Sequence, residues 1–142
     1  MLYAIIGESC TGKSTLAEKL KEKINAEIYS GKDYLRLAKN ENIAKKLFEK
    51  KLKEAVNGEN LIYVIAEKEH LSLIPEGAVR ILAKADLSVI KERFALRMRG
   101  ILPPPVEKML EAKHGCFDHI ACSYVYDSGA DDADELIKEI AQ

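Results

Sequence analysis

Near its start the chain reads Gly7-Glu8-Ser9-Cys10-Thr11-Gly12-Lys13-Ser14-Thr15, which is the pattern G-x-x-x-x-G-K-S. A short apolar run precedes it at residues 2–6, and residues 13–25 carry apolar side chains at helical spacing. Because glycine accepts backbone angles that a Cβ forbids, successive N–H groups of such a loop can turn toward a phosphate chain. The positive end of the following helix points at the same anion. The sequence therefore predicts a phosphate-binding loop (P-loop) between a buried strand and a helix.

The residues of this loop have different expected roles. We expect all nine positions to bind the phosphates of a nucleotide, Cys10 through its backbone alone. Lys13 is the expected catalytic cation at the β- and γ-phosphates, and the Ser14 hydroxyl is the expected ligand of Mg²⁺.

Further apolar runs predict a parallel α/β sheet. Strands are expected at residues 26–30, 61–66, 79–83 and 123–126, and the run at 61–66 is apolar throughout, as is typical of a central strand. Helices are expected at residues 42–56, 87–99, 106–113 and 131–141. Strands that alternate with helices favour a parallel sheet, and no linker divides the chain, so we expect one domain over residues 1–142.

Composition narrows the function classes. The chain has 142 residues, is 47% hydrophobic, has a formal net charge of −1 and shows no basic block, so nucleic acid is not an expected partner. It contains no apolar run long enough to span a membrane, so no membrane partner is expected. Its three cysteines do not suggest a disulfide framework, and the first strand leaves no room for a signal peptide. We expect a cytoplasmic protein, monomeric or homodimeric.

The chain resembles the nucleoside monophosphate kinase branch of P-loop proteins, which includes adenylate, guanylate and cytidylate kinases. Besides the loop, Asp33-Tyr34-Leu35-Arg36 is similar to an adenylate kinase segment, Arg93 to Arg99 to a lid helix, and residues 117–141 to the guanylate kinase ending. The resemblance implies a three-layer P-loop NTPase fold, α/β, with a five-stranded parallel sheet flanked by helices and a small lid around residues 87–113. It also implies ATP and Mg²⁺ as cofactors and transfer of the γ-phosphate to a nucleotide, nucleoside or other small-molecule acceptor.

Three arginines of the expected lid are candidate catalytic residues. Arg93 and Arg97 are four residues apart and therefore share a helix face. A guanidinium binds phosphate oxygens with a fork of donors, and the resemblance implies that Arg93, Arg97 and Arg99 neutralise the transferring phosphoryl group. The alternative is a solvated helix face.

Three further residues are candidates for binding the acceptor. Asp33 is a candidate base for its hydroxyl proton, and the resemblance implies that Arg36 holds its phosphate. Glu67 follows the expected central strand, where a carboxylate could orient an acceptor hydroxyl or hold the water shell of Mg²⁺. The alternatives are an N-cap aspartate, a surface arginine and an exposed loop acid.

Other features leave alternatives open. The acceptor-binding region is abbreviated to roughly residues 36–58, and Met109 stands where guanylate kinases place an arginine, so a non-catalytic or regulatory nucleotide-binding module is the alternative function. A GTPase-like switch is disfavoured because no Asp-x-x-Gly occurs. The pattern His114, Cys116, His119 and Cys122 contains zinc-type ligands, but its tight spacing favours ordinary packing.

Overall fold

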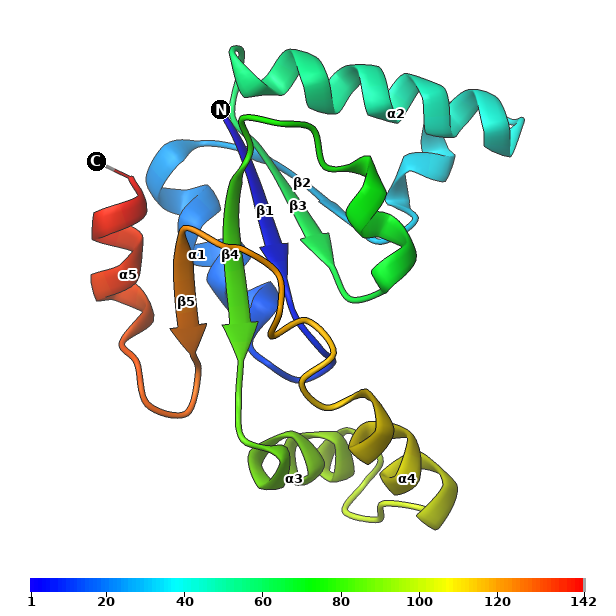
Figure 1. The fold of residues 1–142 in the computed structure, drawn as a ribbon, viewed down its shortest axis with the longest axis vertical. Coiled ribbons are helices and arrows are strands. Elements are labelled where there is room, and N and C mark those ends of the chain that lie inside the picture. The colour runs from blue at the N-terminus through cyan, green and yellow to red at the C-terminus, as the bar shows by residue number, and fades with distance from the viewer. Residues whose placement is uncertain (142) are drawn as a thin grey trace.

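The computed structural model describes residues 1–141, in which one sheet of five parallel strands has the order β2-β3-β1-β4-β5. The expected fold class is confirmed. All strands point the same way, so their carboxyl ends meet at one edge of the sheet (Figure 1). The strands are β1 (Leu2–Ile6), β2 (Glu27–Ser30), β3 (Leu61–Ile65), β4 (Val79–Lys84) and β5 (Tyr124–Asp127).

The helices also lie within two residues of their expected bounds. Two short 3₁₀ helices follow β2 and β3, namely η1 (Asp33–Leu37) and η2 (Lys68–Leu73), and η2 was not predicted. No helix within residues 1–141 has the length and apolar character needed to cross a membrane. The α-helices are α1 (Lys13–Ile24), α2 (Glu41–Val56), α3 (Leu87–Arg97), α4 (Pro104–Lys113) and α5 (Ala133–Ile140).

The central strands are buried on both faces because alternate side chains point to opposite sides of the sheet. In β1, Leu2, Ala4 and Ile6 face the core that contains α2, whereas Tyr3 and Ile5 face the core that contains α1 and α5. Figure 1 shows α1 and α5 on one side of the molecule and α2 on the other. The sheet is therefore the middle of three layers.

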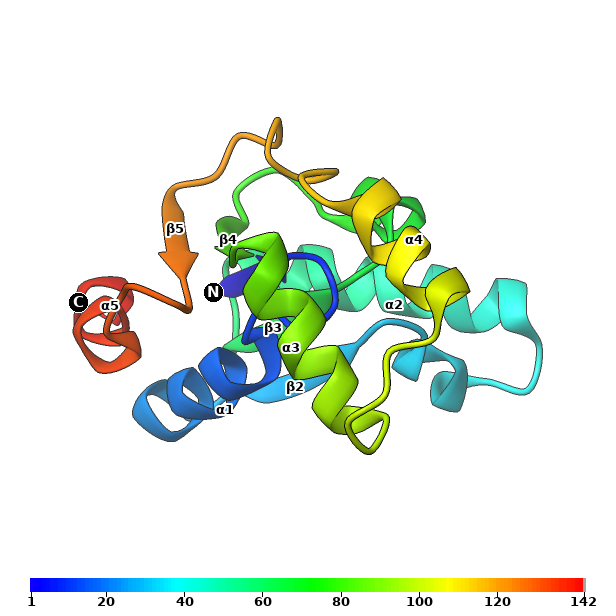
Figure 2. The ribbon, with the colours of Figure 1, turned by 90° about the horizontal axis from the view of Figure 1, so that it is seen from below.

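Helices α3 and α4 form a hairpin beyond the carboxyl edge of the sheet, where Figure 2 shows α3 crossing in front of the strand ends. The turn between them contains Gly100 with φ +89° and ends at Pro103, the N-cap of α4. A small apolar cluster, in which Ile90 of α3 and Leu110 of α4 pack with Cys10 and Ala85, joins the hairpin to the P-loop. This hairpin, residues 87–113, therefore lies against the loop.

Candidate active site

The P-loop follows β1 directly and is held by hydrogen bonds to backbone carbonyls of β3 and of the loop itself. The Gly7 N–H donates to the carbonyl of Ile65 at 3.1 Å, and the Thr11 hydroxyl donates to the carbonyl of Glu8 at 2.8 Å. A Cβ on Gly7 would collide with the carbonyl of Ala83, and Gly12 has φ +85°. Glycine is therefore required at both positions, for space at the first and for backbone angle at the second.

Lys13 is a buried cation with a carbonyl partner. Its side chain begins α1, the residue is only 8% exposed, and its ammonium donates to the Glu8 carbonyl. Burial lowers the pKa of Lys13 to about 8, with the charge of Arg97 acting in the same direction and those of Cys10 and Glu8 opposing it. A cation in this state is stabilised by an incoming anion.

Two cavities flank the loop. The phosphate cavity has a volume of about 230 Å³ and extends from the loop to the ends of β2 and β3; its lining residues are Ser9 to Thr15, Ser30, Val64, Ala66 and Arg97. The β5 cavity has a volume of about 330 Å³ and extends from the loop to the end of β5; its lining residues are Cys10, Gly12, Thr15, Arg93, Arg97, Tyr126 and Ser128.

The three candidate arginines occupy different places. Arg93 donates through Nη1 to the Cys10 carbonyl at 3.0 Å and to the Ser128 hydroxyl at 2.7 Å, so it joins α3, the P-loop and the segment after β5. Arg97 is exposed and borders both cavities. Arg99 lies beyond the end of α3 with φ +63° and, among the described residues, lines neither of them.

The three acceptor candidates are not gathered at one point. Asp33 accepts the Ser30 N–H at 2.9 Å, which holds its carboxylate beside a residue that lines the phosphate cavity. Glu67 is exposed after β3, with its carboxylate 3.9 Å from the Lys113 ammonium. Arg36 instead lies against β2, with Nη2 3.6 Å from Glu27 and Cζ 4.3 Å from the centre of the Tyr29 ring.

The Glu8 carboxylate has a contact that the motif did not predict. Its Oε1 accepts the Gly115 N–H at 3.2 Å and lies 3.2 Å from His114 Nδ1. The only acidic side chain of the loop is thereby turned to the end of α4, and Glu8 does not line the phosphate cavity in the described residues. No local sequence signal predicts this contact, because His114 and Gly115 lie 106 and 107 positions after Glu8 in the chain.

Three of the four residues considered as zinc ligands make other contacts. Cys116 and Cys122 pack against the core on the α2 side of the sheet, and His114 meets Glu8. Within residues 1–141, no three His, Cys, Asp or Glu side chains are arranged to hold a metal ion. His70 is buried in η2 next to Tyr34 and Tyr63.

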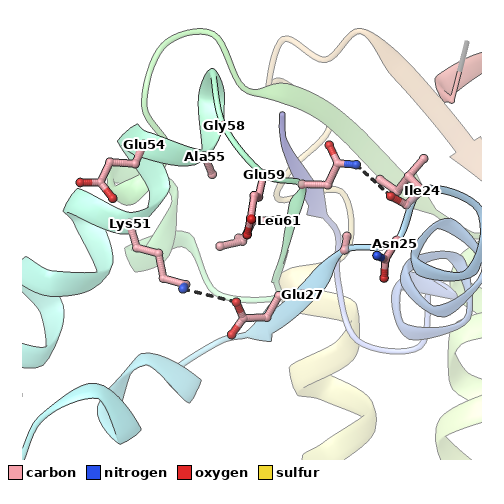
Figure 3. A pocket seen from close by; sticks show the side chains of 11 residues that line it. Ile24, Asn25, Glu27, Lys51, Glu54, Ala55, Gly58, Glu59 and Leu61 are labelled. Carbon is pink, nitrogen blue, oxygen red and sulfur yellow. Dashed lines mark hydrogen bonds and ion pairs between the residues drawn. The ribbon is translucent and has the colours of Figure 1, made fainter.

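A cavity larger than the phosphate and β5 cavities lies away from the loop, at the amino ends of the strands. It has a volume of about 790 Å³ and lies between the end of α1, the start of β2 and the end of α2 (Figure 3). Two of its charged side chains, Lys51 and Glu27, pair with each other at 3.3 Å. The volume of a cavity does not identify the functional site in this protein, because this cavity is lined by none of the P-loop residues.

The geometry at the loop fits a polyphosphate and its metal ion. The phosphate cavity combines the loop backbone with two cations, Lys13 and Arg97, and the loop's one carboxylate is turned away. Ser14 is exposed on the cavity at the first turn of α1, where its hydroxyl could hold Mg²⁺. The sequence pattern did not indicate Ser30, Tyr126 and Ser128 as lining residues. Ser30 ends β2, Ser128 directly follows β5 and Tyr126 lies one residue before the end of β5, so all three lie near the edge where ligands bind in parallel sheets.

Comparison with solved structures identifies the fold as that of P-loop kinases. The chain is 26% identical to the YorR protein of Bacillus subtilis, solved in complex with phosphorylated GDP, with a TM-score of 0.61 over 99% of this chain and 93% of that one. It is 12% identical to shikimate kinase from Acinetobacter baumannii, with a TM-score of 0.66 over 99% and 90% of the two chains. A sugar kinase from a Janibacter species is 17% identical, with a TM-score of 0.64 over 98% and 91%.

These structures show the fold of P-loop kinases and do not single out the nucleoside monophosphate kinase branch. No family model and no curated protein sequence matches the chain.

Proposed function

We propose that the protein is a phosphotransferase that moves the γ-phosphate of Mg-ATP to a hydroxyl group of a small molecule. The observation that carries this proposal is the pair of cavities on the two sides of one P-loop, with Arg97 bordering both. The β5 cavity offers space for the nucleoside part of the donor. The phosphate cavity leads to the ends of β2 and β3, where an acceptor can approach. The P-loop kinase fold supports the same assignment.

The donor is held mainly by the loop and by α3. The backbone N–H groups of the loop and the Lys13 ammonium bind the phosphates, while the nucleoside part lies in the β5 cavity beside Tyr126. Arg93 fixes the walls of that cavity through its hydrogen bonds to the Cys10 carbonyl and the Ser128 hydroxyl. When bound at Ser14, Mg²⁺ supplies positive charge to the β- and γ-phosphates.

Transfer breaks the bond between the γ-phosphorus and the bridging oxygen and forms a bond between that phosphorus and the acceptor oxygen. Lys13 and Arg97 stabilise the negative charge on the transferring group, the step at which a protein contributes most. Asp33 accepts the proton of the acceptor hydroxyl, and Glu67 orients the acceptor from β3. The α3–α4 hairpin, which packs against the loop, excludes water that would otherwise compete as an acceptor.

A coupled assay of ADP release tests this function. The protein is given ATP and Mg²⁺ with each of a set of nucleosides, nucleotides, sugars and small hydroxy acids, and the rate without acceptor is the baseline. We expect at least one acceptor to raise ADP release well above that baseline. A flat set of rates in a protein that binds ATP would contradict the proposal.

One observation favours a second candidate, a nucleotide-binding module without transfer. Met109 takes the place of an expected arginine and lines a small cavity with Ile90 and Leu110, so α4 brings no guanidinium there. This candidate predicts ATP binding with no acceptor-dependent ADP, which is the flat result of the same assay.

A further inference from the structure

We infer that the acceptor of this protein carries a hydroxyl group but neither a phosphate nor a carboxylate group. The inference rests on the proposed function, because it concerns the acceptor side of the same site. The observation behind it is that the cation expected to bind an acidic acceptor, Arg36, is engaged by Glu27 and Tyr29 of β2.

Arg36 belongs to a network on the edge strand. Its guanidinium stacks on Tyr29 at 4.3 Å and shares Glu27 with Lys51, whose ammonium lies 3.3 Å from that carboxylate. Tyr29 is 2% exposed, and its ring packs on Phe48 with centroids 5.1 Å apart. Arg36 thus covers the outer side of a core aromatic ring, and moving it to a ligand would uncover that ring.

The direction of Arg36 also takes it away from the phosphate cavity. Its carboxylate partner Glu27 is the first residue of β2, whereas Ser30, the last, lines the cavity. Three residues of extended strand separate the two by about 10 Å. Among the residues that the structure describes, Arg36 does not line the cavity.

The other charged residues at this edge of the sheet do not replace the positive charge of Arg36 in the cavity. The segments directly after β2 and β3 carry two lysines and three carboxylates, at Lys32, Asp33, Glu67, Lys68 and Glu69. Lys113 of α4 adds one positive charge close to Glu67, at 3.9 Å. The charges of these segments and of Lys113 therefore balance, and we assign the two cations that line the cavity itself, Lys13 and Arg97, to the donor phosphates.

The placement of Asp33 favours a neutral hydroxyl compound more directly. Its carboxylate is fixed by the Ser30 N–H at 2.9 Å and therefore lies next to a residue that lines the cavity in which we place the acceptor. A carboxylate accepts hydrogen bonds from hydroxyl groups but repels an anion at short range. Nucleosides and uncharged sugars meet this requirement, and their phosphates and the corresponding sugar acids do not.

Matched pairs of acceptors test the inference. ADP release is measured with a nucleoside and its 5′-monophosphate, with glucose and glucose 6-phosphate, and with a neutral polyol and gluconate. We expect the neutral member of the active pair to have a kcat/KM at least about tenfold higher. A preference for the anionic member would overturn the inference and leave the phosphotransferase standing, whereas no stimulation by any acceptor would overturn the phosphotransferase and the inference together.

Two variants give an independent readout. Arg36→Ala and its matched control Lys51→Ala both remove a cation from Glu27, so we expect both to lower the melting temperature and neither to change the acceptor KM more than about threefold. A large rise in acceptor KM for Arg36→Ala alone would show that Arg36 binds an acidic acceptor, and would overturn the inference.

Discussion

The two sides of the P-loop differ in how their arginines are used. On the β5 side, Arg93 connects the loop carbonyl of Cys10 with Ser128, and Arg97 borders the cavity. On the β2 side, Arg36 lies on Tyr29 and Glu27. The β5 side is thus tied to the loop by the hydrogen bonds of Arg93, while the arginine of the β2 side is engaged outside the cavity. The difference teaches that the fold prepares phosphate binding, whereas acceptor selection depends on side-chain placements that vary independently.

Replacement of Lys13 should have the largest effect. We expect Lys13→Ala to reduce kcat/KM for ATP by about a thousandfold, because the lysine contributes to transition-state charge stabilisation of about 3–4 kcal/mol. Lys19→Ala is the matched control, since Lys19 is on the same helix but its ammonium pairs with Asp134 at 2.9 Å. Equal activities of the two variants would mean that the donor side is not where we place it.

The substitution Asp33→Asn tests the proposed base on the acceptor side of the P-loop. The amide can still accept the Ser30 N–H, so the local fold is kept, but it cannot take a proton at neutral pH. We expect kcat to fall by about a hundredfold with little change in the KM for ATP. A normal kcat would remove Asp33 from the mechanism and leave Glu67 as the remaining carboxylate candidate.

Substitutions of the hairpin arginines should differ in effect according to where each arginine lies. Arg93→Ala removes the donors to Cys10 and Ser128, so we expect the KM for ATP to rise by about 10- to 30-fold, in line with the loss of one or two charge-assisted hydrogen bonds. Arg99→Ala should change it less than about twofold, because that residue lies beyond α3. A similar loss in both would indicate a general electrostatic effect of the hairpin.

The pH dependence of ATP binding tests the state of Lys13 and has a smaller expected size. Burial lowers the pKa of Lys13 to about 8, so the side chain is cationic below this pH and becomes neutral above it. Because the bound triphosphate favours the cation, we expect ATP affinity to fall by about tenfold between pH 7 and pH 9, as measured by titration calorimetry. In Lys13→Arg the charge persists across this range, so the fall should vanish.

Much of the fold could be predicted from the sequence, because its signals are local. The P-loop with its flanking strand and helix is one continuous stretch, and the apolar runs of β3 and α2 define their own periodicity. The contacts of Arg36 with Glu27, of Arg93 with Ser128 and of Glu8 with Gly115 could not be predicted, because each depends on how separate segments meet. The motif at Asp33 to Arg36 suggested two acceptor-binding side chains, and the structure places only the first of them near the cavity.

The most direct test of the central claim is phosphorus NMR of the protein with Mg-ATP and one neutral hydroxyl acceptor at a time. We predict a new phosphomonoester signal that grows at the same rate as ADP, requires the acceptor and is lost in Lys13→Ala. Persistence of the ATP signals with every acceptor in a protein that binds ATP, or release of inorganic phosphate alone, would contradict the assignment as a small-molecule phosphotransferase.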